Sequence, residues 1–231
     1  KSFCKKNLLA ISNSLKQEQK KYNISLCGGD TTYSNKLSFS ITSVGYSKNI
    51  VYRNKAKLND DIYVTGNLGD SFVGLKILKK KIKFKKKANN YFIKKYYHPD
   101  IQIPLAKKLL KFANTSIDIS DGLIADLDKM LNNLNCSYQI YEDKIPISKY
   151  LSELIKKKKL KKSKLISNGD DYQILFTAST SKSRIIQRTS RILDIKITKI
   201  GKIISGKKKS SILDQKSKQI LLKNKGYIHQ F

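Results

Sequence analysis

The spacing of apolar residues changes its period near the middle of the chain. Ile117 and Ile119 alternate with Asp118 and Ser120, which is typical of a strand with one buried face. From Leu123 onward the apolar residues recur at intervals of three and four, which predicts an amphipathic helix. We therefore expect the polar residues between the two patterns to gather where a strand ends and a helix begins.

Similar patterns along the rest of the chain predict a protein of the α/β class. Helices are expected over residues 3–22, 71–80, 88–97, 104–112, 123–131, 147–159 and 182–193. Strands are expected over residues 23–27, 37–44, 62–65, 115–120, 137–141, 173–178, 195–200 and 210–213. The alternation becomes regular near residue 57, which favours sheets with helices packed on them. We place a domain boundary there, with a first domain over residues 1–56 and a second over residues 57–231.

The junction at residues 118–122 has two interpretations. Asp118 and Asp121 are close together at the start of a helix, where carboxylate oxygens suit a magnesium ion and phosphate chemistry. Ser or Asp before an apolar run is also the ordinary signature of a helix N-cap. The residues of this stretch alone leave both interpretations open.

Two other loops combine glycine with acidic residues. In Gly-Gly-Asp-Thr-Thr at residues 28–32, Gly29 would let a ligand approach the backbone and Asp30 offers a carboxylate. A polar hairpin turn explains the same residues, and we favour the turn from this loop alone. In residues 168–172, Asp170 and its acidic neighbour either orient a ligand or a metal or form a plain turn.

Two glycine-containing segments match phosphate-binding loops only in part. Residues 66–70 follow an expected strand and open a helix, but they lack the third glycine of a dinucleotide-binding turn, so we favour a structural role. Residues 201–208 have the glycine and lysine spacing of a phosphate loop. Lys208, however, stands where Ser or Thr must hold magnesium, and a strand is expected next. We reject this segment as a nucleotide site.

The formal net charge of +31 raises nucleic acid as a partner. Only four of the 48 basic residues are arginine, the residue best suited to read phosphates and bases. The lysines run in tracts such as residues 156–159, which we interpret as compositional drift on solvated faces, so we expect no specific nucleic-acid partner. Arg53 is the one arginine in the first 183 residues, which favours a role for its planar guanidinium group in binding phosphate.

The length and the hydropathy of the chain favour a globular protein. Its 231 residues are 39% hydrophobic, which is enough to bury a core. No apolar run is long enough to span a bilayer and no secretory signal is visible, so we expect no membrane partner. The three scattered cysteines form no metal or disulfide pattern, which favours the cytoplasm. Because residue 1 is Lys1 and a helix is already under way, we expect that an N-terminal part is lacking.

Five motifs occur in the order found in thiamine-monophosphate kinases, a family of the wider aminoimidazole ribonucleotide synthetase superfamily. They are Gly-Gly-Asp-Thr-Thr at 28–32, Tyr-Val-Thr-Gly-x-Leu-Gly-Asp at 63–70, Ile-Asp-Ile-Ser-Asp-Gly-Leu at 117–123, Asn-Gly-Asp-Asp-Tyr at 168–172 and Gly-Tyr-x-x-x-Phe at 226–231. The chain resembles this kinase family over essentially its whole length. The first and third motifs are shared across the superfamily, whereas the combination with the fourth and the last is more specific to the kinase.

The resemblance implies a fold of the aminoimidazole ribonucleotide synthetase-like type, with two α/β domains, mixed sheets and a homodimer. It implies ATP-dependent phosphorylation of thiamine phosphate to thiamine diphosphate, with several magnesium ions held by aspartates. By motif match, the implied site residues are the metal ligands Asp30, Asp118 and Asp121, the ATP contacts Gly29, Asp30, Arg53 and Ser120, and the substrate contacts Asp170 and Tyr227, with Phe231 as a helper.

Three departures from the family pattern qualify the resemblance. The N-terminal region, with further metal-binding aspartates, is absent, so we expect an incomplete first domain and weak or no activity from this chain alone. The fourth motif usually reads Gly-Gly-Glu-Asp-Tyr, whereas Asn168 and Asp170 stand here for Gly and Glu. The tail usually reads Gly-Tyr-Asp-His-Phe, whereas Ile228 and one additional residue intervene here.

The chemistry of the kinase fits the residues. Phosphoryl transfer to an ionised phosphate needs positioning and charge neutralisation rather than a strong base, which agrees with the presence of only two histidines.

Two alternatives compete with the kinase. Another ATP-using enzyme of the same superfamily is the first alternative, and the acidic fourth loop and the tail argue against it. A basic nucleic-acid-binding protein is the second. It predicts basic and aromatic side chains interleaved on one face, whereas the loops here are acidic.

Overall fold

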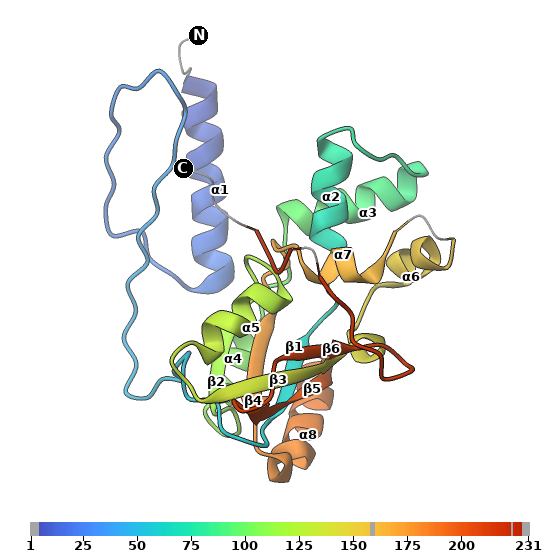
Figure 1. Ribbon diagram of the computed structural model, residues 1–231. Coiled ribbons are helices and arrows are strands. Elements are labelled where there is room, and N and C mark those ends of the chain that lie inside the picture. The colour runs from blue at the N-terminus through green and yellow to red at the C-terminus, as the bar shows by residue number, and fades with distance from the viewer. Residues whose placement is uncertain (1–4, 158–159, 223, 228–231) are drawn as a thin grey trace. The chain divides into compact units, whose positions relative to one another are not determined.

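The computed structural model describes residues 5–157, 160–222 and 224–227 (Figure 1). The chain divides into two compact units, residues 1–46 and residues 47–231. The domain boundary expected between residues 56 and 57 stays a prediction.

The first unit contains the helix α1, Lys5–Tyr22, which confirms the expected helix at the start of the chain. The strands expected over residues 23–27 and 37–44 are wrong, because the described residues from 24 to 46 form no strand. A strand is stabilised by a hydrogen-bonded neighbour, and this unit provides none among its described residues. The alternating apolar side chains, such as Phe39 and Ile41, are correspondingly exposed.

The second unit is built on a mixed sheet, as the resemblance implies. Within the described residues its six strands have the order β2-β4-β1-β5-β3-β6. Neighbouring strands are antiparallel except for β3 and β6, which are parallel. The strands are β1 Asp61–Thr65, β2 Thr115–Asp118, β3 Cys136–Tyr141, β4 Ile174–Ala178, β5 Ile197–Ser205 and β6 Ser211–Leu213.

The described helices of this unit match the expected ones closely. The short helix α7 is an addition that the periodicity did not predict. The segment after residue 206 continues into the strand β6 rather than a helix, which agrees with the rejection of residues 201–208 as a phosphate loop. The helices are α2 Asp70–Leu78, α3 Lys86–Tyr97, α4 Ile103–Leu109, α5 Leu123–Leu131, α6 Lys149–Lys156, α7 Lys162–Ile166 and α8 Ser183–Leu193.

Both faces of the sheet are covered by packed residues. Successive side chains of the central strand β1 point to opposite sides, and each side belongs to a different core cluster. Ile62 and Val64 belong to the same core cluster as Leu127 of α5. Tyr63 belongs instead to a second cluster, which includes Leu105 of α4 and Ile186 of α8. All five residues of β1 are therefore buried, so this strand fixes the positions of the elements around it.

A third core cluster lies among four helices beyond the end of β1. Val73 of α2, Phe92 of α3, Leu151 of α6 and Leu165 of α7 form its buried centre. Figure 1 shows these helices grouped away from α5 and α8. None of the helices in the described part of the chain is long and apolar enough to cross a membrane.

The topology brings two strand ends together. Both β1 and β2 run antiparallel to β4, so their carboxyl ends lie at the same end of the sheet. In the pairing register, Val64 lies opposite Leu175 and Asp118 lies opposite Ile174. The residues just before β4 are therefore flanked by the turn after β1 on one side and by the junction after β2 on the other.

Candidate functional site

The junction between β2 and α5 is held by a residue that the sequence patterns did not single out. Asp126, fully buried in the first turn of α5, accepts hydrogen bonds through Oδ2 from the backbone N–H groups of Ser120, Asp121 and Gly122, at 3.0, 2.9 and 3.1 Å. A carboxylate at this position also compensates the positive end of the helix dipole. The N-cap itself is Gly122, with φ of 131°. Because Asp126 caps the junction, the carboxylates of Asp118 and Asp121 are not needed as caps.

Asp118 and Asp121 have different surroundings. Asp118 ends β2 with an exposed side chain. Asp121 forms an ion pair with Lys129, whose Nζ also lies 2.8 Å from Oδ1 of Asp126. The hydrogen bonds to Asp121 and then to Asp126 raise the pKa of Lys129. Asp121 therefore has a resident cation as its partner, whereas Asp118 is open to solvent.

The loop of residues 168–173 lies along the same junction. The backbone N–H groups of Asp170 and Tyr172 donate to the carbonyls of Ser120 and Ile119, both at 2.9 Å, and Ile119 donates to the carbonyl of Gln173 at 2.9 Å. Gly169 fits where nothing larger would, since a Cβ there would lie 1.8 Å from the carbonyl oxygen of Ser120. The fourth and third family motifs are thus one structural unit.

The side chains of this loop that face the junction carry negative charge and an aromatic ring. The pKa of Asp170 is raised by burial and by the nearby carboxylate of Asp121. The pKa of Tyr172, which is 46% exposed, is raised by burial and then by Asp170 and Asp118. Three carboxylates and a phenol therefore share one region at the end of β2, although the sequence analysis assigned no role to Tyr172.

The C-terminal tail reaches the same region. Tyr227 donates its backbone N–H to the carbonyl of Asp121 at 2.9 Å, and Ala125 donates to the carbonyl of Lys225 at 3.1 Å. Gly226 packs closely on α5, since a Cβ there would lie 2.3 Å from the Cβ of Ala125. The side chain of Tyr227 is 64% exposed. The expected helper Phe231 lies outside the described residues.

The remaining predicted site residues belong to other segments of the chain. Gly29 and Asp30 belong to the first unit, where Asp30 is exposed and accepts the N–H of Thr31 at 2.7 Å. Arg53 is exposed, and the carbonyl of its neighbour Tyr52 accepts a hydrogen bond from the hydroxyl of Thr115, at the start of β2. The roles expected for these residues stay predictions.

The described residues contain no group of three or more His, Cys, Asp or Glu side chains close enough together to hold a metal ion. The carboxylates of Asp118, Asp121 and Asp170 are nevertheless hard oxygen donors of the kind that magnesium prefers. The donor chemistry of the junction therefore fits the ion, and the full set of ligands stays a prediction.

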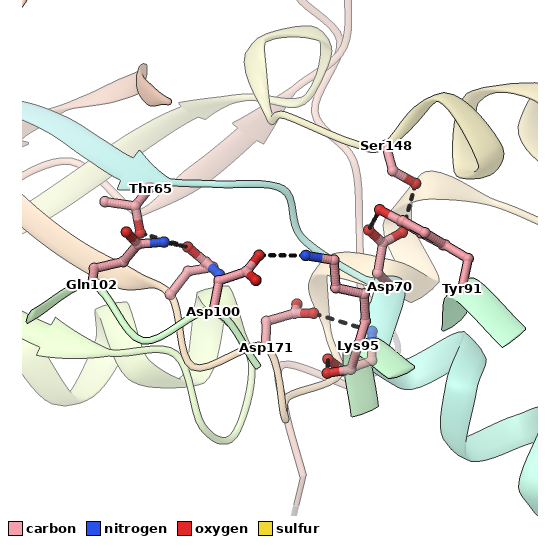
Figure 2. Close-up of polar contacts among 10 residues, drawn as sticks. Thr65, Asp70, Tyr91, Lys95, Asp100, Gln102, Ser148 and Asp171 are labelled. Atoms are coloured by element: carbon pink, nitrogen blue, oxygen red, sulfur yellow. Dashed lines mark hydrogen bonds and ion pairs between the residues drawn. The ribbon is translucent and has the colours of Figure 1, made fainter. Parts of the chain in front are cut away.

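A second polar region lies on the inner side of the loop of residues 168–173 (Figure 2). Asp171 is 5% exposed, and its Oδ2 accepts the N–H of Gly69 at 2.7 Å. Nearby, Asp70 accepts hydrogen bonds from Ser148 Oγ at 2.6 Å and from the hydroxyl of Tyr91 at 2.8 Å. Both carboxylates and the ion pair of Lys95 and Asp100 line a cavity of about 50 Å³. Its lining residues are Gly66, Asn67, Asp70, Ser71, Lys95, Pro99, Asp100, Asp171 and Gln173.

Burial dominates the electrostatics of this inner region. It raises the pKa of Asp70, and it raises the pKa of Asp171 to about 8 despite the hydrogen bonds that Asp171 receives from Gly69 and Ser71. The two carboxylates also repel each other. Sequence patterns could not have revealed this region, since Asp171 and Gly69 are 102 residues apart.

The chain is similar to curated thiamine-monophosphate kinases over nearly its whole length. It is 39% identical over 225 residues to the enzyme of Buchnera aphidicola subsp. Schizaphis graminum, covering 96% of this chain and 69% of the relative. It is 38% identical over 226 residues to the enzyme of the Acyrthosiphon pisum subspecies, with the same coverage of both chains. No protein-family model matches the sequence.

Solved structures with the same fold include two kinases. Thiamine-monophosphate kinase from Stenotrophomonas maltophilia K279a has a TM-score of 0.63 and 28% identity, over 71% of this chain and 52% of that chain. AaThiL complexed with AMPPCP and TMP has a TM-score of 0.62 and 27% identity, over 77% of this chain and 54% of that chain. The chain thus spans about half the length of these solved chains. An identity of 39% over 69% of a curated relative shows that the chain belongs to the thiamine-monophosphate kinase family.

Proposed function

We propose that this protein phosphorylates thiamine phosphate to thiamine diphosphate, with ATP as the co-substrate. The observation that carries the proposal is the gathering of Asp118, Asp121, Asp170 and Tyr227 at the end of β2. Family membership supports it, as does the likeness to AaThiL, which was solved with TMP and with AMPPCP, an ATP analogue. The chain spans 69% of the length of this curated relative.

Asp118 and Asp121 are the proposed magnesium ligands at this junction, and Asp30 is a proposed ligand from the first unit. Magnesium, when bound, supplies charge neutralisation for the phosphates that approach each other. Asp118 is exposed and can bind the ion directly, whereas Asp121 must give up its ion pair with Lys129 in order to bind it. Ser120, with Gly29 and Arg53, is proposed to contact ATP.

Asp170 and Tyr227 are the proposed contacts to thiamine phosphate. The thiazolium ring of this substrate carries a permanent positive charge, which a carboxylate and the face of an aromatic ring both attract. Asp170 is partly buried beside Asp121, and Tyr227 is docked by its backbone on the same aspartate. The substrate's phosphate is already ionised, so the transfer needs positioning rather than a strong general base.

The proposal includes a homodimer in the cytoplasm, and it excludes a specific nucleic-acid partner despite the net charge of +31. The test compares thermal melting of the chain with magnesium alone, ATP alone, both together, both with thiamine phosphate, and duplex DNA. ATP with magnesium should raise the melting temperature more than either alone, and thiamine phosphate should raise it further. Salt-sensitive protection by DNA, with none by ATP and magnesium, would favour the nucleic-acid alternative and overturn the proposal.

A further inference from the structure

Alternate side chains of the loop of residues 168–173 contact two different parts of the structure. Asp170 and Tyr172 interact with the carboxylates at the end of β2. Asp171 and Gln173, which alternate with them, contact the turn between β1 and α2 instead. One short segment thus connects the proposed substrate site to the glycine-containing turn of residues 66–70, which the sequence analysis treated as structural.

Asp171 forms the first of these connections. Its carboxylate accepts the N–H of Gly69 at 2.7 Å and lies 3.4 Å from the N atom of Ser71. These two N–H groups belong to the amino end of α2, whose N-cap Gly69 has no side chain to bond them. Asp171 therefore acts as the cap of a helix whose N-cap residue, Gly69, lies 102 residues earlier in the chain.

Gln173 adds a second connection on the same side. Its Oε1 accepts the hydroxyl of Thr65 at 2.7 Å, at the last residue of β1. Gly66 lies directly against this side chain, since a Cβ there would lie 2.4 Å from Oε1. The side chain of Gln173 therefore joins the loop before β4 to the last residue of β1 and to the glycine that follows it.

The backbone of the loop shows the effect of this anchoring. Asp170 has φ of 67° and Tyr172 has φ of 50°, in the left-handed region that residues other than glycine adopt rarely. Such conformations persist where the surrounding structure determines them, and they cluster at binding sites. The two left-handed residues flank Asp171, so the residue that caps α2 lies between the two unusual backbone conformations of the loop.

We propose that Asp171 is a positioning residue for the kinase reaction, and the inference rests on the proposed function. By capping α2 it fixes the left-handed loop, and the loop in turn presents Asp170 and Tyr172 to thiamine phosphate. Asp171 itself is buried and contacts neither the carboxylates at the end of β2 nor the open surface around them. Asp171 also lines the cavity next to the ion pair of Lys95 and Asp100.

The test uses Asp171→Ala, Asp171→Asn and a matched control, Asp60→Ala. Asp60 is also a buried carboxylate, and it accepts hydrogen bonds from Lys57, Asn114 and Thr177, away from the loop. Its removal should lower stability in a comparable way without touching residues 168–173. Asp171→Asn keeps one oxygen that can accept the N–H of Gly69, so it should rescue part of what Asp171→Ala loses.

The first measurement is hydrogen exchange, which needs no ligand. In Asp171→Ala the amides of Asp170 and Tyr172 should exchange at least about ten-fold faster relative to the amides of β4 and β5. In Asp60→Ala these two amides should change only in step with the rest of the sheet. Equal exchange at Asp170 and Tyr172 in the wild type and in Asp171→Ala overturns the positioning role, whatever the protein's function.

The second measurement is calorimetric titration with thiamine phosphate in the presence of magnesium and with magnesium–ATP separately. Asp171→Ala should weaken thiamine phosphate binding by about ten-fold, which is ~1.4 kcal/mol, and ATP binding by much less. Asp171→Asn should fall between Asp171→Ala and the wild type. Equal losses in Asp171→Ala and Asp60→Ala reduce Asp171 to a stability residue. Failure of the wild type to bind thiamine phosphate at all contradicts the proposed function, while the exchange result still decides whether Asp171 fixes the loop.

Discussion

The backbone N–H of Tyr227 donates a hydrogen bond of 2.9 Å to the carbonyl of Asp121. The tail is thereby attached to Asp121, a proposed metal ligand that directly precedes the N-cap of α5, and the side chain of Tyr227 is 64% exposed. This hydrogen bond joins two backbone atoms, so a change of the Tyr227 side chain keeps both its donor and its acceptor.

Tyr227→Ala is expected to weaken thiamine phosphate binding and to leave ATP binding nearly unchanged. A cation over an aromatic ring gains about 0.5–2 kcal/mol, and ~1.4 kcal/mol corresponds to a ten-fold loss of affinity. Calorimetric titration of each ligand measures the difference, and Tyr227→Phe, which keeps the ring, serves as the control. Equal losses of both ligands, together with a lower melting temperature, would show that Tyr227 only packs against its own unit.

Asp118→Asn is expected to abolish magnesium-dependent binding of ATP while the melting temperature stays the same. The side chain is exposed at the end of β2, so the fold does not depend on it, whereas an amide cannot replace a carboxylate charge beside magnesium. ATP binding is measured by titration with and without magnesium. Asp194→Asn is the matched control, since Asp194 is an exposed carboxylate at the far end of α8, with φ of 50°, which Asn also tolerates. Unchanged ATP affinity in Asp118→Asn removes Asp118 from the site.

Asp126→Ala is expected to lower the free energy of unfolding by about 1–3 kcal/mol, because three backbone N–H groups lose their shared acceptor. Urea denaturation measures the change, and Asp143→Ala, an exposed carboxylate outside the core, should change it by less than about 0.5 kcal/mol. Magnesium-dependent ATP binding should fall as well, since the junction that orients Asp118 and Asp121 is loosened. A stable variant with intact binding would contradict the capping role.

The buried carboxyl of Asp171 predicts a dependence of stability on pH. Its pKa is about 8 in the folded protein, whereas its ordinary value is 3.8, so between these values the folded state holds a proton that the unfolded state releases. The contribution of Asp171 to the free energy of unfolding is therefore largest below about pH 4 and is lost as the pH rises towards 8.

Asp171→Asn removes this titration, which makes it the reference for the measurement. The free energy of unfolding of the wild type, minus that of Asp171→Asn, should fall as the pH is raised from about 4 to 8 and should be flat below that window. Urea denaturation at a series of pH values gives both quantities. A difference that rises with pH would mean that Asp171 is stabilised as an anion by the N–H groups of α2.

The spacing of apolar residues along the sequence correctly predicted individual strands and helices. The alternation at Ile117 and Ile119 located β2, and the apolar spacing from Leu123 located α5, because burial on a sheet face or a helix face imposes those periods directly. The family motifs also led to four residues, Asp118, Asp121, Asp170 and Tyr227, that lie around one junction.

Contacts between distant residues could not be predicted in the same way. The cap that Asp171 provides to α2 depends on β1 and β4 being neighbours, which no local pattern records. The extended segment around Phe39 alternates like a strand but lacks a partner among the described residues, so periodicity alone gave the wrong result there. Asp126 was within reach of sequence reasoning, since an acidic residue in the first turn of a helix is a known capping signal.

The fit of Gly169 against Ser120 limits how the substrate preference of this kinase can be altered by protein engineering. Even the methyl group of alanine at position 169 would overlap the carbonyl of Ser120, which belongs to the junction itself. Its neighbour Asn168 is only partly buried and its side chain bonds to the backbone of α7, so position 168 is less constrained than position 169. A mutant library aimed at new thiamine analogues should therefore vary position 168 and keep glycine at 169. At positions 170 and 172 it should favour residues that tolerate a left-handed backbone, such as Asn, Asp and Gly.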